Sequence, residues 1–167
     1  MGNSFTEYQK FGFWSRDWLL ESWLRMLALN LPDDVYKPCW VRDLRDDWLL
    51  QSAGFFSGCV SPKLDQHCSH KDQRETILAT AQAVRTKIQT FDQRIPTSFF
   101  YAMGIAFVEY REWVPKEDLE SIATRFIDLL EGKLTTTAPS SPVLPTPWEI
   151  SIGEGANSSN SSRDCPA

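Results

Sequence analysis

Apolar residues recur at the spacing of an α-helix in two long segments of this chain, and this pattern constrains the fold more than any other feature. Over residues 72–91 and again over 115–132, apolar side chains return every three or four residues on one face, and polar side chains fill the opposite face. Ser69 with Asp72 forms a typical N-terminal cap for the first segment, and Gly132 a typical end for the second. Both segments are predicted to be amphipathic helices.

Three further segments show helical periodicity, at residues 6–29, 41–53 and 96–113. The last is apolar on most of its sides, and a helix that is apolar all round belongs in the interior of a domain. No alternation of the kind that marks a β-strand extends over a useful length. We therefore predict an all-α fold, an irregular bundle of about five helices over residues 1–134, with the helix at 96–113 in its centre.

The composition changes after Lys133. Residues 135–167 are rich in Thr, Ser, Pro and Gly and lack apolar periodicity, apart from a short apolar stretch at 148–152. Such a segment cannot bury enough apolar surface to offset the entropy lost on ordering. It is predicted to be a disordered tail.

The charge balance bears on the choice of partner. The formal net charge is −5, from 17 basic and 22 acidic residues, and Lys and Arg form no run. Such a chain repels nucleic-acid phosphates and favours basic partners. The sequence contains neither a secretory signal nor a stretch of about 18 apolar residues that could span a membrane. We expect a cytoplasmic protein that binds neither nucleic acid nor membrane, and the oligomeric state stays open.

Four residues of metal-ligating or nucleophilic type lie close together in the sequence: Cys59, His67, Cys68 and His70. Structural zinc sites pair their ligands at short spacing in two knuckles, which this order does not reproduce. A catalytic cysteine needs a base that a third group orients, and neighbouring loop residues do not ensure that. The interpretation we prefer is a polar loop, so no catalytic residue, metal ligand or cofactor site is predicted, although a metal-binding protein or an enzyme built on this loop remains an alternative.

The helix predicted at 41–53 carries an acidic ridge. Asp43, Asp46 and Asp47 fall together opposite the stripe of Val41, Leu44 and Trp48 that should face the core. An ordinary solvated face explains this pattern. The alternative is a surface that binds a basic partner.

Two tryptophans near the N-terminus present a second candidate surface. In the helix predicted at 6–29, Trp14 and Trp18 project onto the polar side with Asp17 and Glu21. Another helix or the tail could cover them, or Gly12 could break the helix and shift the pattern. If neither holds, they are anchors for a partner protein, because Trp is enriched at the energetic centres of interfaces.

Two segments resemble a known class of proteins. The sequence LRDDWLLQSAGFFSGCV at residues 44–60, followed by FIDLLEG at 126–132, is similar to the small helical immunity proteins of bacterial polymorphic-toxin systems. The resemblance covers about residues 15–134 and implies a protein for bacterial competition that binds one cognate toxin and blocks its active site or its access to substrate. Proteins of this kind do no chemistry themselves.

The residues alone are compatible with this function, since carboxylates in an acidic protein can mimic phosphates in the basic cleft of a nuclease toxin. The partner-binding residues that we expect are Asp43, Asp46, Asp47, Trp14 and Trp18. A helical adaptor or regulatory subunit with some other partner is the remaining alternative.

Overall fold

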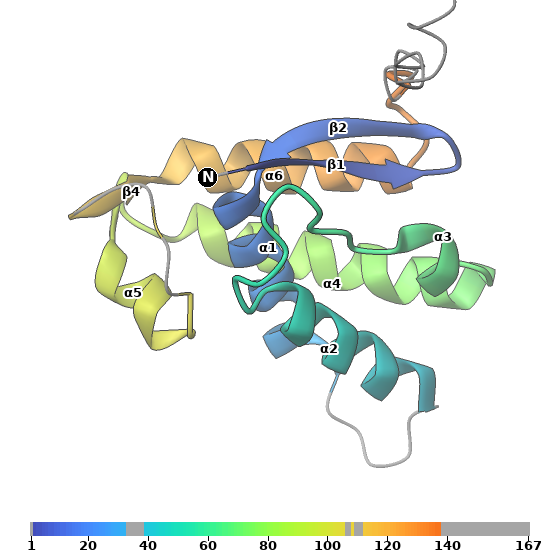
Figure 1. Ribbon diagram of the computed structural model, residues 1–167, viewed down its shortest axis with the longest axis horizontal. Coiled ribbons are helices and arrows are strands. Elements are labelled where there is room, and N and C mark those ends of the chain that lie inside the picture. Colours follow the sequence, from blue (N-terminus) through green and yellow to red (C-terminus); the bar gives the residue numbers. More distant parts are fainter. Residues whose placement is uncertain (1, 33–38, 106–107, 109–111, 138–167) are drawn as a thin grey trace, which may run out of the picture.

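The computed structural model describes residues 2–32, 39–105, 108 and 112–137. Within these residues the fold is mixed, with two small antiparallel sheets and six helices, of which α1 (Asp17–Asn30) is the central one (Figure 1). The prediction of an all-α bundle is therefore wrong. The two departures from it are the first sixteen residues and the segment that follows residue 93.

The N-terminal residues form a β-hairpin where a helix from residue 6 was predicted. Strand β1 (Asn3–Tyr8) pairs with β2 (Phe11–Arg16) in antiparallel register, with Thr6 opposite Phe13. Gln9 and Lys10 link the strands with φ angles of 49° and 68°, the combination found in two-residue type I′ turns. Most such turns contain Asn or Gly, so nothing in the sequence marked this one.

The strands of the hairpin were also difficult to predict because two polar residues, Ser4 and Thr6, share its inner face with Tyr8 and Phe13. Ser4 and Thr6 are buried, whereas Phe5 and Trp14 lie on the outer face with their ring centroids 5.3 Å apart. A strand with this arrangement lacks the usual alternation of apolar inside and polar outside. We call the side of the hairpin that carries Phe5 and Trp14 the outer aromatic face.

Gly12 fits a tight place in this hairpin. A Cβ atom there would lie 2.0 Å from the carbonyl oxygen of Thr6 and 2.8 Å from the ring of Phe5. The Gly12 amide donates to the Thr136 carbonyl (2.7 Å), so the chain after the last helix lies against β2. The first residues of the tail that was predicted to be disordered over 135–167 therefore lie against the hairpin. The rest of that tail, residues 138–167 with the apolar stretch at 148–152, lies outside the described residues.

We expect Gly12→Ala to lower the free energy of unfolding by about 1–3 kcal/mol, because the backbone must shift to admit the methyl group. Urea unfolding measures this change. Ser98→Ala, at an exposed site in the short helix α5 (Thr97–Ala102), is the control and should change the free energy of unfolding by less than about 0.5 kcal/mol. An unchanged unfolding midpoint for Gly12→Ala would contradict this packing of the hairpin.

The second departure concerns the centre of the domain, which was predicted to be a helix at 96–113. Strand β3 (Arg94–Pro96) leads into α5 (Thr97–Ala102), which ends before Gly104 at a φ of 84°, and β4 (Trp113–Pro115) then pairs with β3. Part of the predicted helix, including Phe107 and Tyr110, lies outside the described residues. Phe100 and Ile105 are buried, so apolar residues of this segment do contribute to the hydrophobic core.

The central helix is α1, which buries ten of its fourteen residues against neighbours on several sides. It contacts α2 (Cys39–Gln51), α4 (Lys71–Gln89) and α6 (Lys116–Leu130). These three helices confirm the segments predicted at 41–53, 72–91 and 115–132. The one-turn helix α3 (Leu64–His67) was not predicted.

Aromatic rings join three of these helices at the centre of the core. Trp23 of α1 meets Phe126 of α6 at 5.6 Å between ring centroids, and Trp48 of α2 meets the same ring at 6.4 Å. All three side chains are fully buried. The predicted core position of Trp48 is therefore confirmed.

The ends of α4 and α6 are held by local hydrogen bonds. The Gln73 side-chain oxygen accepts from the His70 amide (3.1 Å) and from the Ser69 hydroxyl (2.9 Å), so Gln73 rather than Asp72 completes the N-terminal cap of α4. Gly132, with a φ of 74°, ends α6 as predicted: its amide and that of Lys133 turn back to the Leu129 and Asp128 carbonyls. None of the helices in the described part of the chain is long and apolar enough to cross a membrane.

Candidate partner-binding site

The acidic ridge predicted on α2 is divided by the structure. Asp43 and Asp46 are exposed on the outer side of the helix. Asp47 instead joins two basic side chains, since its Oδ1 lies 2.5 Å from Lys63 Nζ and its Oδ2 lies 2.9 Å from His67 Nε2. The exposed carboxylates of the ridge are therefore those of Asp43 and Asp46, while Asp47 links α3 to α2.

The two predicted tryptophan anchors have different environments. Trp14 keeps 50% of its surface exposed on the outer aromatic face of the hairpin. Trp18 is only 3% exposed, and its ring packs edge-on against Phe100 with centroids 6.4 Å apart. Trp14 is thus a surface residue, whereas Trp18 belongs to the core.

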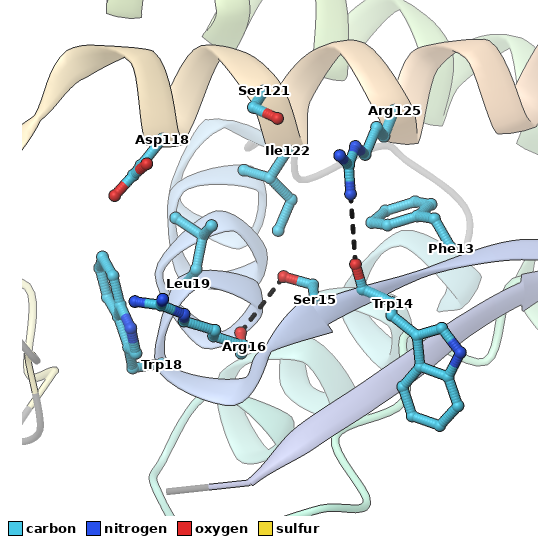
Figure 2. Close-up of a pocket in the computed structure, with 10 residues that line it drawn as sticks. All are labelled: Phe13, Trp14, Ser15, Arg16, Trp18, Leu19, Asp118, Ser121, Ile122 and Arg125. Carbon is cyan, nitrogen blue, oxygen red and sulfur yellow. Dashed lines mark hydrogen bonds between the residues drawn. The ribbon is translucent and has the colours of Figure 1, made fainter.

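A pocket of about 250 Å³ lies where β2, the start of α1 and α6 meet (Figure 2). Phe13, Leu19 and Ile122 supply apolar side chains to its lining. Trp14 contributes its backbone carbonyl, which accepts a hydrogen bond from Arg125 Nη1 at 3.4 Å, whereas its indole points away from the pocket (Figure 2). The pocket and the outer aromatic face therefore lie on two sides of the same strand.

The two candidate surfaces are well separated in space. In Figure 1 the hairpin lies at one edge of the molecule beside α6, α2 lies at the opposite edge, and α1 lies between them. A small interface cannot cover both Trp14 and the pair Asp43 and Asp46. Variants of the two surfaces consequently distinguish which one a partner contacts.

The structure adds a buried acidic pair on α1 that the sequence analysis placed on a polar helix face. Asp17 accepts hydrogen bonds from the Ser4 hydroxyl and from the Gly58 amide, each at 2.6 Å. The Ser4 hydroxyl accepts in turn from the Val60 amide (2.8 Å). These bonds fasten the hairpin and the loop after α2 to the start of α1, so Asp17 has a structural role.

Glu21 lies one turn further along α1 and is 5% exposed. Burial, and then the negative charge of Asp17, raise the pKa of the Glu21 carboxyl to about 7, although Arg25 acts in the opposite direction. A carboxyl with such a pKa suits acid–base catalysis. The carboxyl of Glu21 is buried, however, and cannot contact a substrate in solution. Its raised pKa therefore affects the stability of the folded protein.

Among the residues that the structure describes, Cys59, His67, Cys68 and His70 do not assemble into one site. Cys59 is exposed and Cys68 is buried, and burial raises the pKa of the Cys68 thiol to about 12, which disfavours the reactive thiolate. His67 bonds to Asp47, and His70 lies at the N-terminus of α4. Across the residues that the structure describes, no three His, Cys, Asp or Glu side chains are grouped so that they could hold a metal ion.

Sequence reasoning missed the polar lining of the pocket, above all Ser121 and Arg125 of α6. Both lie on the polar side of an amphipathic helix, and that position gave no reason to select them over other exposed residues. Their place in the lining of a pocket becomes evident only when the tertiary structure shows β2 beside α6.

Comparison with known proteins identifies no relative: no family model, no curated protein and no solved structure matches this chain.

Proposed function

We propose that this protein is a cytoplasmic immunity protein, which binds a toxin enzyme and blocks its active site or its access to substrate. The observation that supports this proposal most directly is the outer aromatic face of the hairpin. Phe5 and Trp14 contact each other there, and half of the Trp14 surface is open to solvent. Large aromatic side chains on a rigid strand are typical anchors of protein interfaces.

Asp43 and Asp46 support the same proposal in a second way. They add negative charge to the exposed side of α2, in a chain that is already acidic overall. Charges of this kind speed the approach of a basic protein and fix its orientation more than they add affinity. In the proposed complex, Trp14 supplies affinity and the α2 carboxylates steer association.

The first test measures affinity for the toxin encoded beside the gene of this protein. Trp14→Ala should weaken binding by about 30-fold, which corresponds to about 2 kcal/mol for an interface anchor. Trp113→Ala, in which an exposed tryptophan of the other sheet is removed, is the matched control and should leave affinity unchanged.

The double variant Asp43→Asn with Asp46→Asn tests the steering role. It should slow association, by about tenfold at low salt, and should reduce the salt dependence of the association rate, with little effect on dissociation. If Trp14→Ala and the double variant both bind as the parent does, the interface lies elsewhere. A helical adaptor is the alternative function, and it predicts a partner that keeps its own activity in the complex.

A further inference from the structure

The pocket beside the hairpin contains a pair of polar groups arranged for recognition of an anion. Ser121 and Arg125 are four residues apart on α6, so their side chains project from the same face and both line the pocket (Figure 2). The guanidinium of Arg125 has five N–H donors in a planar fork. The hydrogen bond that it makes to the Trp14 carbonyl is long, at 3.4 Å, and occupies one of its two terminal nitrogens.

The charges around the pocket favour a ligand with one negative charge. Arg16 and Arg125 are positive and Asp118 is negative, which leaves a net charge of +1 on the lining. Figure 2 shows Asp118 and the Arg16 guanidinium toward the Trp18 end, with Arg125 toward the opposite end near Phe13. The Arg125 end is therefore the more positive one.

The size and the apolar lining narrow the choice of ligand further. The volume of about 250 Å³ lies below the roughly 300–1,000 Å³ of pockets for drug-sized molecules. The side chains of Phe13, Leu19 and Ile122 can contact methylene groups. A single amino-acid side chain with a short aliphatic stem fits this combination.

We propose that this pocket binds a carboxylate side chain, that of a glutamate or aspartate on the surface of the partner protein. Arg125 donates two parallel N–H hydrogen bonds to the carboxylate, and the Ser121 hydroxyl donates a third. The aliphatic stem of the bound side chain contacts the apolar lining of the pocket. A phosphate group shares part of this chemistry, but its second negative charge is disfavoured by Asp118. The proposal rests on the proposed function only for the source of the side chain.

NMR titration of the full chain with three probes tests this inference without the partner. N-acetyl-glutamate α-amide should shift the amide signals of residues 13–16 and 118–125, with a dissociation constant on the order of millimolar. The uncharged N-acetyl-glutamine α-amide should shift them at least tenfold less at the same concentration. Inorganic phosphate should bind more weakly than the glutamate probe.

Three variants test whether the shifts of the amide signals arise from binding in this pocket. Arg125→Gln should abolish binding of the glutamate probe, and Arg125→Lys should retain part of it because the positive charge remains while the planar fork is lost. Arg42→Gln, which removes an exposed arginine of α2 that lies outside this pocket, is the control and should bind as the parent does. The dispersion of the amide signals shows whether each variant is folded.

Three results would overturn the inference: equal binding of the glutamine probe, tighter binding of phosphate than of the glutamate probe, or unchanged binding by a folded Arg125→Gln variant. Failure here is distinguishable from failure of the proposed function. If the glutamate probe does not bind while Trp14→Ala still weakens the toxin complex, only the pocket assignment is lost.

Discussion

Trp48→Ala is expected to lower the free energy of unfolding by about 3–5 kcal/mol, the range for removal of a large buried aromatic side chain. Trp48 has no exposed surface and packs edge-on against Phe126 of α6. Its indole Nε1 also donates to the Pro62 carbonyl at 3.0 Å, so the variant leaves that acceptor without its partner in addition to opening a cavity. Chemical denaturation followed by circular dichroism measures the loss.

Leu50→Ala is the matched control, because Leu50 lies on the same helix but is 52% exposed. Leu50→Ala should lower the free energy of unfolding by less than about 1 kcal/mol. Trp48→Phe keeps a ring but lacks the donor, and its stability should lie between those of the parent and the alanine variant. Equal stability of Trp48→Ala and the parent would contradict the packing of α2 against α6.

Glu21→Gln is expected to stabilise the protein above neutral pH and to leave it unchanged in acid. The folded-state pKa of about 7 lies above the ordinary value of 4.5, so folding favours the protonated carboxyl. The unfolded chain therefore loses this proton first, and the parent becomes less stable as the pH rises from about 4.5 to about 7. A pKa difference of this size between the folded and the unfolded chain changes the free energy of unfolding by at most about 3 kcal/mol.

The difference in unfolding free energy between Glu21→Gln and the parent, measured at intervals from pH 4 to pH 8, isolates this group from the other titrating residues. The difference should be near zero at pH 4 and should grow to as much as about 3 kcal/mol at pH 8. Ser98→Ala, which removes no titrating group from an exposed site of α5, should show no such trend. A difference that is constant with pH would mean that Glu21 titrates normally.

Helices with a clear division between apolar and polar faces could be predicted from the sequence. In α4 and α6 the buried residues recur with helical spacing, so their faces were evident. The hairpin could not be predicted, because Ser4 and Thr6 face inward, Trp14 faces outward and the turn lacks Asn or Gly. Of these inward residues, Ser4 is stabilised by hydrogen bonds with Asp17 and Val60, which are distant in the sequence, and no local pattern reports those contacts.

The candidate sites show the same limit. Periodicity on α2 correctly placed Asp43 and Asp46 on the surface, but it could not reveal that Asp47 is paired with Lys63 and His67. The tryptophans were assigned to one helical face, although Trp14 lies in strand β2 and Trp18 lies in the first turn of α1. Pockets formed by three separate elements, such as the one lined by Arg125, require the tertiary structure.

The most direct test of the proposed function is a titration, with this protein, of the enzymatic activity of the toxin that the proposal expects the neighbouring gene to encode. An immunity protein should reduce that activity in proportion to the amount added and abolish it at equal molar amounts, and the Trp14→Ala variant should require an excess. A toxin that keeps its full activity when the parent protein is in saturating excess would contradict the proposal.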